Sequence, residues 1–176
     1  KEDMDARDNM HYAQCLAGMS FTNALLGIVH SLAHKTGAVF QDCGAHIVHG
    51  AANAMYLPKV IAFNARDLEA KKRYATIADY MHLSGANEDE KVASLIKAVR
   101  QLSDDMNIPH GIKFYAADGS IAEQGFVPED VFLERSRAIA ERAVEDACTG
   151  SNPRSVSVDE MEKVLKACYY DTEVDF

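Results

Sequence analysis

The stretch GIVHSLAHKTGAVF, residues 27–40, places His30 and His34 four residues apart inside an apolar segment. Side chains four residues apart lie on one face of an α-helix, so both imidazole rings can reach the same point in space. Apolar residues recur at steps of three and four through residues 6–33. This period predicts one long, mostly buried helix over that range, with Gly37 as its C-terminal cap.

Further helical patterns follow downstream. Residues 46–65 are rich in alanine and large apolar residues, and they predict a second buried helix that is kinked or broken near Pro58. The remaining helices are expected over residues 67–83, 87–106, 128–147 and 158–171. No segment alternates with the period of two that is typical of a strand. About six helices and no strand predict an all-α fold, a helical bundle.

Local signals mark where these helices start and stop. Asn87 and Ser157 are each followed three residues later by a glutamate, the spacing of a capping box. Pro128 is expected to start one helix, and Gly150 to close it. Residues 109–126 contain three glycines without a sustained period, which predicts a loop with at most a short turn of helix.

The composition describes one acidic globular domain. The chain has 176 residues, of which 48% are hydrophobic, and a net charge of −9, which argues against a nucleic acid or an anionic membrane surface as partner. Four cysteines without a CxxC pair predict neither a disulfide framework nor a thiolate zinc site, and they indicate a reducing cytoplasm. No apolar run reaches the roughly 18 residues of a membrane span.

Two more histidines follow the first pair. His49 is expected at the start of the second helix, where a turn between antiparallel helices would bring it to His30 and His34, and His46 is a second candidate. Two histidines four apart are more often ordinary core or surface residues, but three that converge in a buried place predict a divalent metal site. His110 lies in the glycine-rich loop and is expected to have a solvated or turn role.

Three segments together resemble a known family: AGMSFTNALLGIVHSLAHKTGAVF (17–40), HIVHGAANAMYLPKVIAFN (46–64) and CTGSNPR (148–154). They look like the iron-containing alcohol dehydrogenases, nearest to the butanol dehydrogenase and bifunctional aldehyde-alcohol dehydrogenase branch. The resemblance covers residues 17–170. It implies that residues 1–176 form the helical, metal-binding C-terminal domain of a dehydroquinate synthase-like two-domain fold. The implied activity is NAD(P)-dependent interconversion of alcohols and aldehydes by metal-assisted hydride transfer.

The resemblance also implies roles for individual residues. In the family a divalent ion is held by one Asp and three His, and His30 and His49 match two of these histidines. His34 matches a non-ligand histidine beside the nicotinamide and the substrate, where it would relay a proton. Phe21 and Cys148 match residues that line the substrate cavity. The implied metal is Fe²⁺, with Zn²⁺ as the alternative.

Parts of the family pattern are missing from this sequence. The chain starts at Lys1 in what reads as a helix already in progress, and it contains no Gly-rich phosphate loop. We therefore expect that the α/β domain, which would bind NAD or NADP and supply the other two ligands, is absent and that this piece alone is inactive. Residues 41–45 read as an insertion that leaves His46 in competition with His49, although the following HGAANA favours His49.

The expected partners are a small alcohol or aldehyde, the protein's own N-terminal domain, and further copies of the chain in a homo-oligomer. Two alternative functions are a helical interaction domain that kept the fold and lost catalysis, and a zinc-using relative of the glycerol dehydrogenases. The imidazoles do not distinguish iron from zinc.

Overall fold

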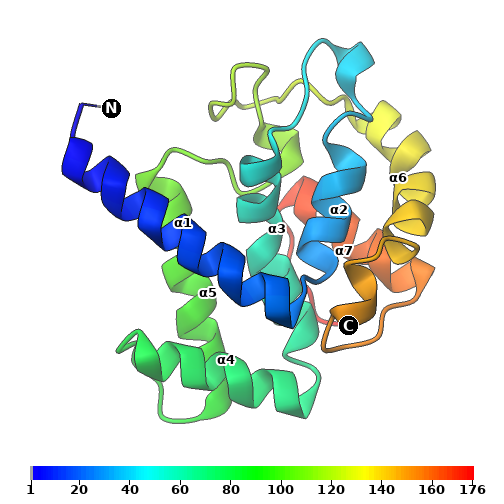
Figure 1. Cartoon of the computed structure of the whole chain (residues 1–176). Helices are drawn as coiled ribbons and strands as arrows, with labels where there is room; N and C mark the ends of the chain where they lie inside the picture. Colours follow the sequence, from blue (N-terminus) through cyan, green and yellow to red (C-terminus); the bar gives the residue numbers. More distant parts are fainter. Residues whose placement is uncertain (1) are drawn as a thin grey trace.

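A computed structural model describes residues 2–176, and every regular element in this range is helical (Figure 1). The α-helices are α1 (Met4–Ala24), α2 (Ile28–Thr36), α3 (His49–Asn64), α4 (Leu68–Tyr80), α5 (Glu88–Asp105), α6 (Glu129–Val144) and α7 (Val158–Tyr170). Three single turns of 3₁₀-helix lie between them: η1 (Gln41–Cys43), η2 (Ile112–Phe114) and η3 (Thr149–Ser151). The prediction of an all-α fold is confirmed.

Helix α3 lies at the centre of the bundle, where it packs against α2, α5 and α7, while α6 packs against α2 and α7 (Figure 1). The main core contains large side chains that are fully removed from solvent, among them Leu32, Tyr56 and Phe132. Phe132 stacks on Tyr169 of α7 with 4.0 Å between the ring centroids. This packing holds α2 beside the N-terminal end of α3, the two elements that carry the histidines.

The single helix expected over residues 6–33 is two helices, α1 and α2, bent by 109° relative to each other. Leu25 adopts a left-handed φ of 62°, and Ile28 N–H donates to Asn152 Oδ1 over 3.3 Å. A Cβ at Gly27 would lie 2.8 Å from that same oxygen, so the close approach requires glycine. The prediction was wrong because the apolar period continues through the bend. The bend depends on the contact with Asn152, which lies more than a hundred residues away in the sequence.

The expected burial holds for α2 but not for α1. Five of the nine residues of α2 are buried, whereas none of α1 is, and Met10 and Leu16 are 68% and 63% exposed. Figure 1 shows the N-terminal end of α1 projecting away from the other helices. No single helix among the described residues is both long and apolar enough to cross a bilayer; α1 and α2 reach that threshold only as a pair, across their bend.

An expected helix break and an expected helix end are also corrected. Helix α3 runs unbroken through Pro58, whose neighbours Tyr56 and Val60 are buried in the core. Helix α6 ends at Val144 rather than at Gly150, which lies within η3. The helix ends early because hydrogen bonds turn the chain: Thr149 donates its hydroxyl to Ala143 O over 2.6 Å.

The other local signals held. Asn87 accepts the N–H of Glu90, and Ser157 and Glu160 form a capping box with both of its hydrogen bonds. Gly37 is the C-cap of α2, although its backbone is right-handed rather than left-handed. Residues 109–126 form a loop that contains η2 and one isolated β-bridge.

Candidate metal centre

Helix α2 and the first turn of α3 bring three histidine rings together. The ring centroids lie 6.0 Å apart for His30 and His34, 5.3 Å for His30 and His49, and 5.4 Å for His34 and His49. His34 and His49 are stacked nearly parallel, at 15°. Across residues 2–176, His46 has no such ring contact, so the geometry favours His49 over His46 as the third member of this group.

The rings meet at the surface of this chain rather than in a buried place. His30 is half-buried, while His34 and His49 are exposed. Burial, followed by the nearby rings of His49 and His34, lowers the pKa of His30. Neutral imidazole is the form that binds a metal, so this environment keeps His30 ready to bind an ion at neutral pH.

Asn53 lies one turn along α3 from His49 and contacts its ring. The Nδ2 of Asn53 is 2.9 Å from Nε2 of His49, and Oδ1 of Asn53 is buried without a hydrogen-bond partner among the described residues. A half-turn of the carboxamide exchanges these two atoms and would let Oδ1 accept an Nε2–H from His49. The ring then keeps its Nδ1 lone pair, and metal-bound histidines commonly have such a partner. The donors present therefore fit a divalent ion, with at least two ligands still to be supplied.

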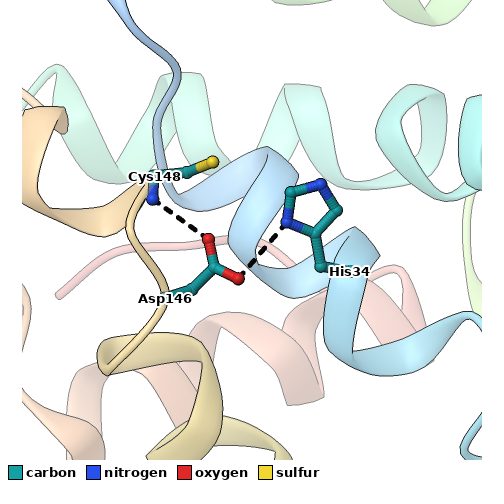
Figure 2. A group of neighbouring side chains, drawn as sticks. All are labelled: His34, Asp146 and Cys148. Carbon is teal, nitrogen blue, oxygen red and sulfur yellow. Dashed lines mark hydrogen bonds and ion pairs between the residues drawn. The ribbon is translucent and has the colours of Figure 1, made fainter.

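A carboxylate approaches His34 from the segment that follows α6. Asp146 Oδ2 lies 3.3 Å from His34 Nδ1 and 2.8 Å from Lys35 Nζ, while Oδ1 accepts the N–H of Cys148 over 3.0 Å (Figure 2). Although partial burial opposes it, the hydrogen bonds from Lys35 and from the backbone of Cys148 hold the pKa of Asp146 well below its usual range. Sequence analysis did not identify Asp146 as a site residue. The feature that could have pointed to it is its position two residues before Cys148.

Phe21 and Cys148 line the same hollow, which has a volume of about 270 Å³ and lies where the end of α1 faces the segment after α6. The Phe21 ring centroid is 6.4 Å from that of His30, so the hollow lies beside the histidine group. Burial, with the neighbouring Asp146 carboxylate, raises the pKa of the Cys148 thiol and keeps it uncharged. An uncharged thiol suits an apolar wall better than a nucleophile.

Comparison with known proteins places this arrangement in context. The model of the "Fe-containing alcohol dehydrogenase family, C-terminal" matches residues 1–169. The NADPH-dependent butanol dehydrogenase of Clostridium saccharobutylicum is 51% identical over 174 residues, which are 99% of this chain and 40% of that protein. The bifunctional aldehyde-alcohol dehydrogenase of Escherichia coli K12 is 37% identical over 180 residues, which are 94% of this chain and 18% of that protein.

Solved structures agree in fold. A 1,3-propanediol oxidoreductase has a TM-score of 0.77 at 30% identity, over 96% of this chain and 39% of the other. An iron-containing alcohol dehydrogenase from Thermococcus thioreducens has a TM-score of 0.78 at 27% identity, over 97% of this chain and 39% of the other. The chain thus spans about two fifths of the butanol dehydrogenase and of each solved relative.

Proposed function

The chain belongs to the Fe-containing alcohol dehydrogenase family, and on that basis we propose that it is the metal-binding part of an NAD(P)-dependent alcohol dehydrogenase that interconverts alcohols and aldehydes. The observation that carries this proposal is the convergence of His30, His34 and His49 beside the hollow lined by Phe21 and Cys148. In a protein of its relatives' length, residues 1–176 would form this helical domain, and an α/β domain would bind the nucleotide and supply the remaining ligands.

The proposed roles of His30 and His49 follow from their position. Both would hold the ion through neutral imidazole nitrogens, and Asn53 would fix the orientation of the second ring. A bound Fe²⁺ or Zn²⁺ supplies a Lewis acid that polarises the oxygen of the alcohol or aldehyde. His30 lies deeper than His49, because α2 is packed between α3 and α6.

His34 would accept the hydroxyl proton when the alcohol is oxidised. Its ring is close to both proposed ligands, and the Asp146 carboxylate beside its Nδ1 would stabilise the positive charge that the ring gains when it takes up a proton. Phe21 and Cys148 would form the wall that contacts the carbon chain of the substrate. A small alcohol or aldehyde fits the scale of this hollow, which is below the usual volume of a drug-sized pocket.

Metal binding by the chain itself tests the proposal without any need for turnover. We expect Co²⁺ to bind weakly, at one ion per chain, because two imidazoles leave half of the coordination sphere to water. His30→Ala and His49→Ala should each abolish the binding, and His46→Ala is the matched control that should leave it intact. Binding that survives His49→Ala and is lost in His46→Ala would overturn the ligand assignment. Turnover of any alcohol by the 176-residue chain would overturn the proposal that a separate α/β domain is needed for activity.

The second candidate function is a helical interaction domain that has lost catalysis. The exposed apolar side chains of α1, such as Met10 and Leu16, favour it because they offer a surface to another protein. This candidate predicts that Co²⁺ neither binds in stoichiometric amount nor responds to changes at His30 and His49. The same titration therefore separates the two candidates.

A further inference from the structure

We propose that Asp146 is a positioning residue for His34: its carboxylate accepts the Nδ1–H of the ring and so leaves Nε2, on the opposite side, unprotonated and ready to take up a proton. The inference rests on the proposed function of His34 and extends it to a residue on a different segment. It concerns the tautomer of one ring, so it can be measured separately from metal binding and from turnover.

The geometry of the pair supports this tautomer. Figure 2 shows Nδ1 of His34 directed at the carboxylate while the other ring nitrogen points away from it. The distance between His34 Nδ1 and Asp146 Oδ2 is 3.3 Å. An ionised carboxylate only accepts hydrogen bonds, so the nitrogen that faces it must carry the proton. In neutral imidazole the second nitrogen then has the free lone pair.

The carboxylate is itself held in place. Its Oδ1 accepts the backbone N–H of Cys148 over 3.0 Å, and its Oδ2 lies 2.8 Å from Lys35 Nζ. The side chain of Asp146 is only 10% exposed, and it lies where α6 packs against α2. Asp146 therefore connects the helix that carries His34 to the turn that carries Cys148.

The same side chains also invite a different interpretation. Donor atoms of His34, Asp146 and Cys148 all lie within 4.8 Å of one another, a spacing compatible with a metal ion. Two features argue against an ion here. The Lys35 ammonium already lies beside Oδ2, the oxygen that faces His34, and a dication would repel it. Cys148 is a protonated thiol with a raised pKa, whereas thiolate is the ligand form.

Removing the acceptor gives a sharp test. In Asp146→Ala no carboxylate faces Nδ1 of His34, so the ring can return to the Nε2–H tautomer that a neutral histidine side chain prefers in water. The matched control is Asp42→Ala, because Asp42 is an exposed carboxylate whose hydrogen-bonded pair is with Arg135 and not with His34. Both variants change the net charge equally.

The measurement is a long-range ¹H–¹⁵N NMR spectrum of the ¹⁵N-histidine-labelled chain at about pH 8.5, where imidazoles are neutral. We expect His34 as the Nδ1–H tautomer in the unmodified protein and in Asp42→Ala, and as the Nε2–H tautomer in Asp146→Ala. An Nε2–H tautomer in the unmodified protein would overturn the proposal, and this holds even if the variant fails to fold. An unchanged tautomer in a folded Asp146→Ala would also overturn it.

A zinc titration of the same samples completes the test. Zinc that shifts the His34 nitrogens, and no longer does so in Cys148→Ala, would overturn the proposal in favour of a metal site. Zinc that shifts only His30 and His49 supports it. If zinc shifted neither His30 nor His49, the result would count against the proposed function alone, because the tautomer of His34 is determined without metal. In a longer form of the protein that includes the nucleotide-binding domain, we expect Asp146→Ala to lower kcat about 100-fold with little change in KM.

Discussion

Helix α3 carries two groups of polar side chains that differ in how completely their members are paired. Around Lys59 the group is closed: the buried ammonium is 2.7 Å from Asp171, and Arg100 contacts both carboxylate oxygens over 2.7 and 2.9 Å. His110 accepts a hydrogen bond from the same guanidinium over 2.6 Å. Around His49 the group is open, with exposed rings and few partners. Polar groups that pair with one another stabilise a fold, whereas polar groups with few protein partners mark where a ligand can bind.

Removing the carboxylate from the closed group should have the largest effect on stability. Asp171→Asn keeps a residue that tolerates the left-handed φ of 57° but leaves Lys59 buried without its counter-charge. We expect the free energy of unfolding in urea to fall by about 3–5 kcal/mol. Asp159→Asn is the control, since it breaks an exposed pair with Arg137 and should have a much smaller effect. Equal losses of unfolding free energy in the two variants would contradict the claim that the closed group stabilises the fold more than an exposed ion pair does.

Acid should also weaken the closed group. Although burial opposes it, hydrogen bonds from Arg100 and Lys59 lower the pKa of Asp171. A carboxyl whose folded pKa lies below its unfolded value, near 3.9, stabilises the fold above that value and loses this contribution as the pH falls. We expect the unfolding free energy to fall below about pH 4 more steeply than in Asp171→Asn, by up to about 1.4 kcal/mol per pH unit. Parallel curves for the two proteins would contradict this account.

In the open group, the support for His49 should matter for metal binding rather than for folding. Asn53→Ala removes the amide that contacts the ring, so we expect the affinity for Co²⁺ to fall about tenfold. Asn53→Asp restores an acceptor at the same place and should recover most of that affinity. A variant chain that binds Co²⁺ as tightly as the original would show that Asn53 does not orient the ring.

The smallest effect expected is that of a ligand on stability. His49→Ala removes an exposed ring that no core residue depends on, so the free energy of unfolding without metal should change by less than about 0.5 kcal/mol. Urea titrations without and with Co²⁺ measure the free energy of unfolding of each protein and the stability that it gains from the ion. Only the unmodified protein should gain stability from the ion. A loss of several kcal/mol would mean that the open group is structural after all.

The sequence predicted those features whose causes are local. The capping residues Asn87 and Ser157 act on the next three residues, and the convergence of His30, His34 and His49 needs only a helical period and one turn. Such features can be read from a single stretch of chain.

The features that were missed depend on residues distant in sequence. The bend at Gly27 depends on Asn152, and the partner of His34 is Asp146, 112 residues away. His110 was expected to have a solvated or turn role, but it accepts a hydrogen bond from the guanidinium of Arg100, which also binds Asp171 at the end of α7. Periodicity carries no information about such contacts, since it records which face of an element is apolar and not what covers that face.

The 109° bend leaves α1 as an arm whose inner end is at Leu25, and Leu25 would be the pivot of any rotation of this arm. Its 21 residues give an arm of about 31 Å, while Phe21 lies only about 6 Å from the pivot. A rotation of about 10° would therefore carry Met4 through about 5 Å and Phe21 through about 1 Å. The arm reduces any displacement of its far end about fivefold at the wall of the hollow. A step of about 1 Å is the scale on which misplaced groups change reaction rates about a hundredfold, so a partner that turned this arm would move the wall of the hollow by an amount that matters for a reaction there.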